Sequence, residues 1–508
     1  MSDAEALMWR LDKDPALTGT YGNLTIVDRA PDFDRMRRRL ERAATIIPRL
    51  HQRVQPSNVG PPQWVDDPLF HLDYHVRRIA LPKPGTLTHL HELATLIVLD
   101  PFERTRPLWQ IVVIEGLRGG RAGVLQKMHH SVGDGEAGVR FLLEFLDFER
   151  DAPEPPPATH QRHPGDHAGR DTAHDTTHDV PVDPDDTGYL PRPDVSEEPP
   201  GTSSESPSDT DVPSGSRSGP TASLAETLTS SLRMPISLLR QVRDLVSDPA
   251  GNARSAETVR LLLAQLTDLG KAQSPLWTRR SLRRHLETLR TPLHAAKQAA
   301  KTLGGPQGVA PGATPGITRG GTLNTAFLAA VSDGVGAYHR ECGAPIDTLR
   351  ASMAISVRTE SSGTNAFTLA RLTVPTGEMS LRDRFAIIHE QATQARVTSM
   401  AAPLERLAPF AAALPAAVIM RIARAQSQTV DFATSNLRGS PIPVFIAGSE
   451  VLANFPLGPL AGVAFNLTAM SYGDSLDMGL HVDPAAVEHP ALLCRHLEQA
   501  FKRLARAR

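Results

Sequence analysis

Apolar and polar positions alternate along much of the chain with the spacings of strands and helices. Residues 22–27 and 123–128 each predict a strand, and residues 110–115 predict a third that returns through Gly119-Gly120. Met36 and Leu40 recur at helical spacing within residues 34–44. A further helix contains His89 and Glu92 and ends near Leu99, whereas the alternation over residues 70–76 predicts a half-buried strand.

The C-terminal part of the chain shows the same mixture of periods. Residues 465–469 and 476–482 alternate around Gly473-Asp474, which predicts a hairpin. A closing amphipathic helix is predicted by Leu493, Leu497, Phe501 and Leu504. Two further helical stripes lie within residues 238–269.

Composition changes sharply over residues 151–222, where large apolar residues almost vanish and acidic residues outnumber basic ones. This stretch cannot form a packed core, so we expect a disordered linker. It divides the chain into residues 1–150, the linker 151–222, a helical and Gly/Pro-rich segment 223–320, and residues 321–508. The linker is rich in histidine, and weak metal binding is one interpretation, although incidental composition is the better one. These histidines are His160, His163, His167, His174 and His178.

The totals exclude several classes of protein. The net charge of the 508 residues is −2, so nothing indicates nucleic-acid binding. Two cysteines, Cys342 and Cys494, are too few for a disulfide framework and fit a reducing compartment. No apolar run approaches ~18 residues, and the acidic start lacks the features of a signal peptide. We therefore expect a cytoplasmic protein without a transmembrane helix.

The strongest candidate site is the heptapeptide at residues 129–135, between the strand at 123–128 and a helix predicted over 138–147. Successive strand side chains point to opposite faces, so one of His129 and His130 is expected to be a general base and the other to point into the scaffold. Asp134 could orient the imidazole, pair with an arginine, or simply cap the helix beside a structural histidine pair. A zinc site would need a third ligand, and none is evident nearby.

Three other features carry open interpretations. His71, Asp73 and His75 would share a face of the predicted strand, as metal ligands or, preferably, as a solvated face. Trp109 is interpreted as a core aromatic that supports the hairpin. An arginine-rich stretch either lies on anionic lipid or forms the solvated face of a crossover helix. Its members are Arg279, Arg280, Arg283, Arg284 and Arg290.

The pattern His-His-x-x-x-Asp-Gly resembles the signature of the acyl-CoA-dependent acyltransferase superfamily, which includes chloramphenicol acetyltransferase and peptide-synthetase condensation domains. Other stretches resemble one branch, the bacterial wax ester synthase/diacylglycerol acyltransferases. They are Pro107-Leu108-Trp109, Asn324, Ser356-Val357-Arg358, Asn365-Ala366-Phe367 and Ser435-Asn436. The chain departs from that branch at Thr325, at Leu437-Arg438 and in an insertion at residues 304–320.

The resemblance implies an α/β fold with two chloramphenicol-acetyltransferase-like domains, mixed sheets flanked by helices, and a substrate tunnel between the domains. His130 would be the general base, because an imidazole can accept a proton from an alcohol as it attacks a thioester. His129 would support it. Asn324 and the backbone N–H near Gly135 would stabilise the oxyanion. Asp134 would form a structural ion pair with Arg358. No metal and no cofactor is implied besides acyl-CoA as co-substrate.

The implied reaction moves a fatty acyl group to diacylglycerol or a long-chain alcohol, giving triacylglycerol or wax ester. Peripheral association with the inner membrane face or with lipid droplets would follow from such lipid substrates. Two alternatives stay open. One is an acyltransferase of the same superfamily that uses another alcohol, an amine or a carrier-bound acyl group, and the other is a catalytically inactive lipid- or CoA-binding homologue.

Overall fold

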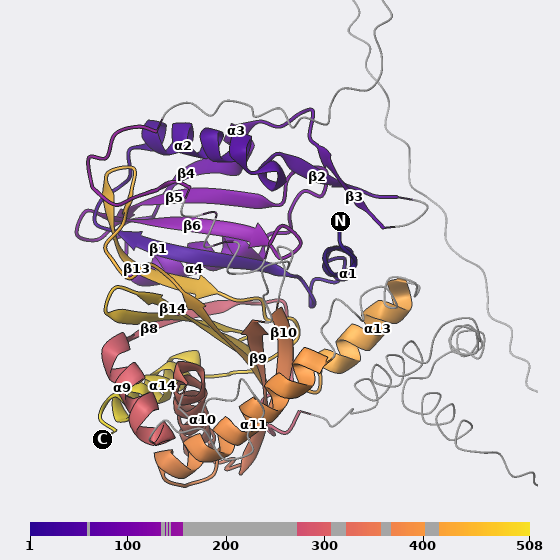
Figure 1. The fold of residues 1–508 in the computed structure, drawn as a ribbon, viewed down its shortest axis with the longest axis vertical. Helices are drawn as coiled ribbons and strands as arrows, with labels where there is room; N and C mark the ends of the chain where they lie inside the picture. The colour runs from indigo at the N-terminus through magenta and orange to yellow at the C-terminus, as the bar shows by residue number, and fades with distance from the viewer. Residues whose placement is uncertain are drawn as a thin grey trace, which may run out of the picture. The chain divides into compact units, whose positions relative to one another are not determined.

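Two mixed β-sheets with helices packed on them form the described part of the protein (Figure 1). The structure is a computed structural model, and these residues all belong to one compact unit. The described residues are 1–57, 61–133, 138, 141, 144–155, 272–305, 322–356, 367–401 and 416–507.

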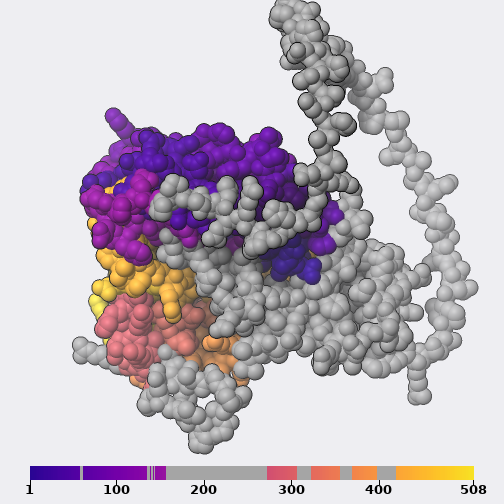
Figure 2. All heavy atoms as spheres, turned by 45° about the horizontal axis from the view of Figure 1, so that its top comes forward, coloured from indigo at the N-terminus to yellow at the C-terminus, as the bar shows by residue number. Residues whose placement is uncertain are grey.

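The first sheet has seven strands in the order β4-β5-β6-β1-β13-β12-β7. Strand β1 pairs antiparallel with both β6 and β13, so strands from the C-terminal half complete a sheet that begins at the N-terminus. Residues from the two ends of the chain accordingly abut in the space-filling view (Figure 2). The strands are β1 (Thr20–Val27), β4 (Val76–Ala80), β5 (Trp109–Leu117), β6 (Arg121–His129), β7 (Leu146–Asp147), β12 (Phe445–Ile446) and β13 (Ser449–Leu457).

Two helices, α2 (Phe33–Ile46) and α4 (Leu87–Leu99), pack on the first sheet. Helix α4 lies close to β1 and β6 because both strands have glycine beneath it. A Cβ atom at Gly22 would come within 2.8 Å of Val98, and one at Gly123 within 2.9 Å of Leu90. The short strands β2 (Gln52–Gln55) and β3 (Gln63–Asp66) form a separate hairpin.

The second sheet has six strands in the order β10-β9-β11-β14-β15-β8. Strand β11 runs parallel to β9 and β14, whereas the other neighbours are antiparallel. The strands are β8 (His285–Pro292), β9 (Thr348–Ser356), β10 (Phe367–Pro375), β11 (Phe432–Arg438), β14 (Phe465–Tyr472) and β15 (Ser475–Val482).

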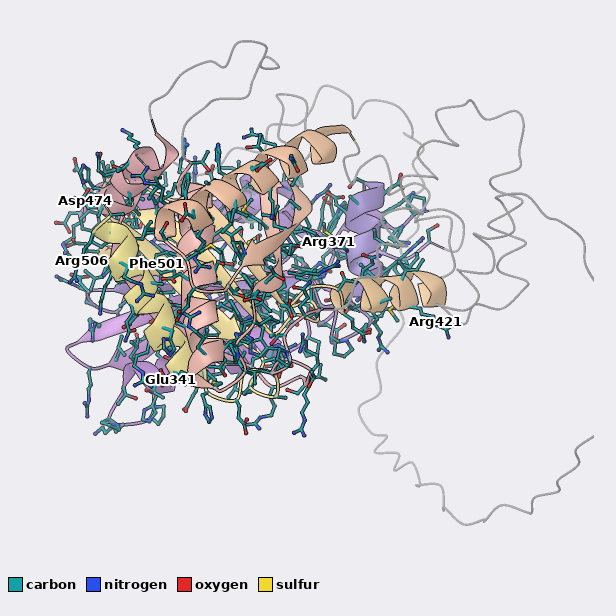
Figure 3. The ribbon with its side chains drawn as sticks, turned by 90° about the horizontal axis from the view of Figure 1, so that it is seen from below. Glu341, Arg371, Arg421, Asp474, Phe501 and Arg506 are labelled. Atoms are coloured by element: carbon teal, nitrogen blue, oxygen red, sulfur yellow. The ribbon has the colours of Figure 1, made fainter. Side chains whose placement is uncertain are left out.

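A large apolar core lies between the second sheet and the helices that pack on it. Phe501, labelled in Figure 3, packs on Phe327 with ring centroids 5.7 Å apart and joins α14 to α10. The helices that contribute to this core are α9 (Leu293–Gly304), α10 (Leu323–Glu341), α11 (Leu381–Ala401) and α14 (Pro490–Ala505).

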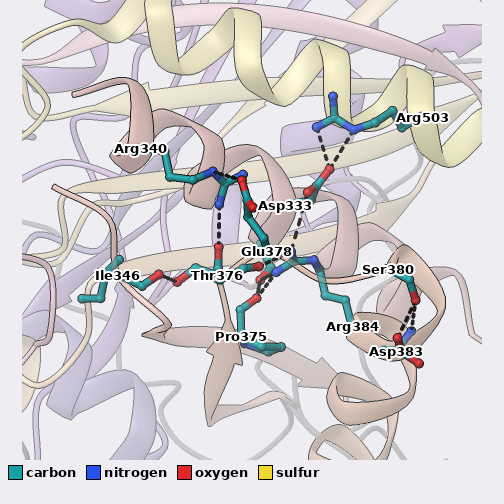
Figure 4. A network of polar contacts seen from close by, with 12 residues as sticks. Asp333, Arg340, Ile346, Pro375, Thr376, Glu378, Ser380, Asp383, Arg384 and Arg503 are labelled. Atoms are coloured by element: carbon teal, nitrogen blue, oxygen red, sulfur yellow. Dashed lines mark hydrogen bonds and ion pairs between the residues drawn. The ribbon is translucent and has the colours of Figure 1, made fainter. Parts of the chain in front are cut away.

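A buried arginine joins three of these elements through polar contacts (Figure 4). Arg384 of α11 is 1% exposed; it donates to the carbonyl of Gly377 at 2.8 Å and also to that of Pro375. Its guanidinium lies 3.7 Å from Asp333 of α10, whose other carboxylate oxygen accepts two hydrogen bonds from Arg503 of α14. This group, Arg384, Asp333 and Arg503, is called the arginine cluster below.

Most of the predicted elements are confirmed. The strands at 22–27, 110–115 and 123–128 correspond to β1, β5 and β6, and the predicted helices at 34–44 and near Leu99 to α2 and α4. The hairpin at 465–482 and the closing helix are also present, as β14, β15 and α14. Trp109 is fully buried and donates from Nε1 to the carbonyl of Leu50 at 2.8 Å, which confirms its role as a core aromatic.

The strand predicted over residues 70–76 is wrong. A helical turn, α3 (Leu72–His75), precedes β4, because the His75 ring inserts between Phe70 and Trp109. Its Nδ1 contacts the carbonyl of Trp109 at 2.8 Å. Asp73 pairs with Arg37 and lies 3.5 Å from His71, whereas His75 is buried, so the three side chains do not share one face.

The helix predicted over 138–147 does not reach its expected end. Gly138 and Phe141 are helical, but Leu146–Asp147 forms β7 and pairs with β12. The difference follows from the burial of Asp147, whose carboxylate lies 2.7 Å from Arg39 and 3.0 Å from Arg35 of α2.

The arginine-rich stretch before β8 is irregular rather than helical. Arg280 donates to the carbonyl of Gly462 at 2.7 Å, and Arg284 donates to that of Ser281 at 2.9 Å. Arg290 pairs with Asp477 at 2.7 Å. The crossover helix therefore does not describe this stretch, and its contact with anionic lipid stays a prediction, with Arg279, Arg283 and Arg290 exposed.

Several predictions fall outside the described residues: the linker from residue 156 onward with its histidines, the stripes within 238–269, and the insertion from residue 306 to 320. Within the ranges that the structure does describe, no helix is both long and apolar enough to cross a lipid bilayer.

Candidate active site

The two histidines lie on a turn whose backbone is held from two sides. Strand β6 ends at His129, which is opposite Thr20 of β1. The backbone N–H of His129 donates to Leu108 at 3.1 Å, and that of His130 donates to Gly19 at 3.1 Å. A further bond from Val132 to the carbonyl of His129, at 2.9 Å, closes the turn. The main chain at both histidines is therefore fixed by the sheet.

His129 points into the scaffold and is 0% exposed. The backbone N–H of Ser131 donates to its Nδ1 at 3.1 Å, and the Ser131 hydroxyl lies 2.7 Å from the same nitrogen. The other ring nitrogen, Nε2, lies 3.3 Å from Oδ1 of Asp12. Because Nδ1 accepts an N–H, a neutral ring carries its proton on Nε2, on the side of Asp12.

Asp12 follows α1 (Asp3–Leu11) as its C-cap residue and has further partners. Thr18 donates to Oδ1 at 2.6 Å, and Arg104 donates to Oδ2 at 3.3 Å. Burial is the largest influence and raises the pKa of Asp12, but His129, Thr18 and Arg104 together hold that pKa below its usual value. Asp12 is therefore a charged carboxylate at neutral pH.

His130 has different surroundings, as the alternation of strand side chains predicts. It is partly exposed, and its ring packs on Tyr21 with centroids 4.7 Å apart and planes tilted by 44°. The Tyr21 hydroxyl donates to the carbonyl of Gly133 at 3.3 Å. Of the two rings, only that of His130 is partly exposed.

Lys127 is a buried charge on the same strand, two residues before His129. Its Nζ donates to the carbonyl of Asp100 at 2.6 Å and lies 4.4 Å from the Phe102 ring centroid. Burial lowers the pKa of Lys127 to about 8. The lysine therefore anchors the segment that leads to the Pro-Leu-Trp stretch.

Asn324 lies in the first turn of α10. Asn436 of β11 donates from Nδ2 to its Oδ1 at 2.7 Å, so two separate motifs of the sequence meet. Thr325 stands where the resembling branch has aspartate. The Thr322 hydroxyl accepts from the Thr325 backbone at 3.2 Å and caps the helix. The departure at Thr325 therefore leaves the helix start intact.

The remaining predicted site residues, Asp134, Gly135 and Arg358, lie outside the described residues. The ion pair between Asp134 and Arg358 and the oxyanion donor near Gly135 stay predictions. Among the residues that are described, no three His, Cys, Asp or Glu side chains gather as metal ligands.

Sequence reasoning missed the partners of His129. Ser131 carried a weak signal, because it follows the strand end by two residues. Asp12 carried no such signal, because it lies far upstream on a loop whose sequence does not indicate contact with His129. Tyr21 was missed as well, because it lies one residue before the strand predicted over 22–27 although it belongs to β1.

Solved structures with the same architecture identify the fold class. A wax ester synthase/diacylglycerol acyltransferase from Marinobacter aquaeolei VT8 matches with a TM-score of 0.57 at 18% identity, covering 99% of this chain and 97% of that one. The first condensation domain of the calcium-dependent antibiotic synthetase gives 0.56 at 13% identity, covering 99% and 95%. A starter condensation domain of rhizomide synthetase, in complex with C8-CoA, gives 0.54 at 12%, covering 99% and 93%. The protein thus has the chloramphenicol-acetyltransferase-like fold, as predicted.

Sequence comparison narrows this class to one family. The family model "Wax ester synthase/diacylglycerol acyltransferase catalytic domain" matches residues 1–185, and "WS/DGAT C-terminal domain" matches residues 363–505. A Mycobacterium tuberculosis protein provisionally named a diacylglycerol O-acyltransferase is 29% identical over 508 residues, covering 99% of this chain and 90% of its own. Another from that species is 25% identical, covering 97% and 92%. The chain belongs to the wax ester synthase/diacylglycerol acyltransferase family.

Proposed function

We propose that this protein is an acyl-CoA-dependent O-acyltransferase that moves a fatty acyl group to diacylglycerol or a long-chain alcohol. The products are triacylglycerol or wax ester. Family membership supports the reaction class. The observation that carries the assignment of the base is the contrast within the turn. His130 is partly exposed beside Tyr21, whereas His129 is fully buried.

In the proposed reaction His130 accepts the hydroxyl proton of the acceptor as its oxygen attacks the thioester carbonyl. Neutral imidazole is a base of suitable strength for this transfer near neutral pH. When the tetrahedral intermediate collapses, the C–S bond breaks and His130 returns the proton to the departing CoA thiolate. Atoms and charge balance without a covalent acyl-enzyme and without a metal.

The intermediate carries an oxyanion that needs fixed hydrogen-bond donors. Asn324 is proposed as one donor. Its Oδ1 is occupied by Asn436, which fixes the amide plane and directs Nδ2 away from that contact. The backbone N–H near Gly135 is proposed as the second donor, and Asp134 with Arg358 as a structural ion pair that shapes the turn.

The proposed organisation of the chain follows from the same reaction. Residues 1–150 carry the histidine turn, residues 151–222 are a linker, residues 223–320 cross over, and residues 321–508 supply the second half of the site. The co-substrate is acyl-CoA, and the substrates are proposed to meet in a tunnel between the halves. Because the acceptors are lipids, we also propose peripheral association with a membrane or a lipid droplet from the cytoplasm.

The test is an acyl-transfer assay with labelled palmitoyl-CoA and three acceptors: dioleoylglycerol, hexadecanol and a primary amine. We expect labelled triacylglycerol or wax ester on thin-layer chromatography, with CoA released in equal amount. Product with the amine alone would assign a different acyltransferase of the fold. Binding of palmitoyl-CoA without any product would show an inactive homologue.

A further inference from the structure

We propose that Asp12 is a positioning residue of this enzyme, which fixes His129 and through it the reactive His130. The proposal rests on the function proposed above. Asp12 lies outside the His-His-x-x-x-Asp-Gly pattern, on the loop between α1 and β1. It contacts a ring that is itself 0% exposed, so it acts through His129 and not on the substrate.

The proton on His129 gives Asp12 its role. Ser131 occupies Nδ1 with a backbone N–H at 3.1 Å, a donor that no side-chain substitution removes. The ring proton must then lie on Nε2, which faces Oδ1 of Asp12 at 3.3 Å. The contact at Nε2 is a close charge contact and not a well-aligned hydrogen bond, and the carboxylate of Asp12 is the charged group that stabilises the buried N–H there. Asp12 therefore selects both the tautomer and the orientation of His129.

Asp12 is itself held rigidly. Thr18 donates to Oδ1 at 2.6 Å, and Arg104 approaches Oδ2 at 3.3 Å. Arg104 is fixed in turn, since it donates to the carbonyl of Trp9 at 2.8 Å and stacks 3.9 Å from the Trp9 ring centroid. The carboxylate can thus transmit a fixed position to the ring, because it has little freedom to follow a shift of His129.

The same loop reaches His130 directly. Its last residue before β1, Gly19, accepts the backbone N–H of His130 at 3.1 Å. A Cβ atom at Gly19 would lie 3.5 Å from Nε2 of His129 and 3.6 Å from Cβ of His130. The loop from Asp12 to Gly19 therefore contacts both histidines. If the contact of Asp12 is lost, the loop and the turn shift together and His130 leaves its reactive position.

Asp14 supplies a matched control within this loop. It is 3% exposed, accepts the backbone N–H of Ala16 at 3.1 Å, and pairs with Arg424 of α13 (Ala416–Ser427). Asp12 and Asp14 are thus carboxylates two residues apart with charged partners, and the contact with a histidine distinguishes Asp12 from Asp14. A loss of loop stability alone should affect both variants alike.

The experiment compares Asp12→Asn, Asp12→Glu and Asp14→Asn in the full chain, measuring kcat, KM for palmitoyl-CoA and Tm. We expect Asp12→Asn to lower kcat by roughly 10- to 100-fold, the range for a small misplacement of a reacting group, with KM within about twofold. Asp14→Asn should lower Tm by a similar amount and keep kcat within about twofold of wild type. Asp12→Glu should restore part of the lost kcat, because it keeps the charge.

A second measurement does not depend on activity. In ¹⁵N-histidine NMR, wild-type His129 should be the Nε2–H tautomer, with its signals assigned by their absence in His129→Asn. Asp12→Asn should shift those signals, and Asp14→Asn should not.

Equal kcat for Asp12→Asn and Asp14→Asn would overturn the proposal, as would an Nδ1–H tautomer in the wild type. A wild-type protein without acyl transfer would instead reject the proposed function, while the NMR comparison would still test the contact between Asp12 and His129.

Discussion

The arginine cluster and the histidine turn are two buried polar groups that use the same components in different ways. In the arginine cluster, one carboxylate is shared by Arg384 and Arg503, and Arg384 also donates to the backbone carbonyls of Pro375 and Gly377. In the histidine turn, the carboxylate of Asp12 is likewise shared, by Arg104 and the ring of His129. Beside it, however, His130 stays partly exposed. A fixed charge pair thus holds structure in one place, and in the other it lies beside the partly exposed ring that we propose as the general base.

Substitution of Asp134 and Arg358 tests whether the histidine turn also contains a purely structural ion pair. Removing one partner of a buried pair typically costs ~3–5 kcal/mol, because the other charge is left uncompensated. Asp134→Asn and Arg358→Gln should each lower stability in that range, and the double variant should lose less than the sum. Urea unfolding and turnover are measured together. Additive losses of stability, with turnover lost through Asp134 alone, would show that Asp134 orients His130 instead.

Arg384→Leu tests the structural member of the comparison. It should lower the free energy of unfolding by about 3 kcal/mol, because the carbonyls of Pro375 and Gly377 lose a buried charged donor. The kcat of the folded fraction should not change. Arg503→Leu is the control, since Arg503 is half-exposed and its loss should cost ~0–1 kcal/mol. A lower kcat in Arg384→Leu at equal folded fraction would remove the distinction between the two clusters.

His75 shows what happens to a buried histidine that has no carboxylate in contact. Burial lowers its pKa to about 4, against which the carbonyl of Trp109 acts weakly. The unfolded chain therefore binds the proton more readily between pH 6.5 and 4, and stability is lost as pH falls through this window. The loss should be at most about 3 kcal/mol and should be smaller in His75→Phe.

Urea unfolding at pH 7, 5.5 and 4 measures this difference. His71, whose side chain is 72% exposed, supplies the control. His71→Phe should follow the wild-type profile. Parallel profiles for wild type and His75→Phe would contradict the assignment of the buried ring as an acid-sensitive element.

Deleting about residues 155–218 should have the smallest effect, since this composition cannot contribute a packed core. Thermal unfolding and acyl transfer by the deletion variant should both stay close to wild type. A clear fall in Tm would show that the segment docks on the folded unit.

Local periodicity was sufficient to predict the strands around the histidine turn and the closing helix, because burial on one face repeats within each element. It failed at residues 70–76, where His75 is drawn under Trp109, a partner from another strand. It also failed at Asp147, which belongs to a strand and forms ion pairs with two arginines of α2.

The candidate site shows the same division between local and distant information. The paired histidines were visible because they are adjacent in the sequence. The contacts of Asp12 with His129 and of Asn436 with Asn324 were not, because they join distant segments that only the folded chain brings together.

The central claim is that His130 removes the acceptor proton while His129 only supports it. The most direct measurement is single-turnover transfer from palmitoyl-CoA to the preferred acceptor by wild type, His130→Ala and His129→Ala, each normalised to folded protein. His130→Ala should be slower by a factor on the order of a hundred or more, with part of the rate restored by added imidazole. His129→Ala should lose Tm and gain nothing from imidazole. A His130→Ala variant that folds normally and transfers palmitoyl at the wild-type rate would contradict the account.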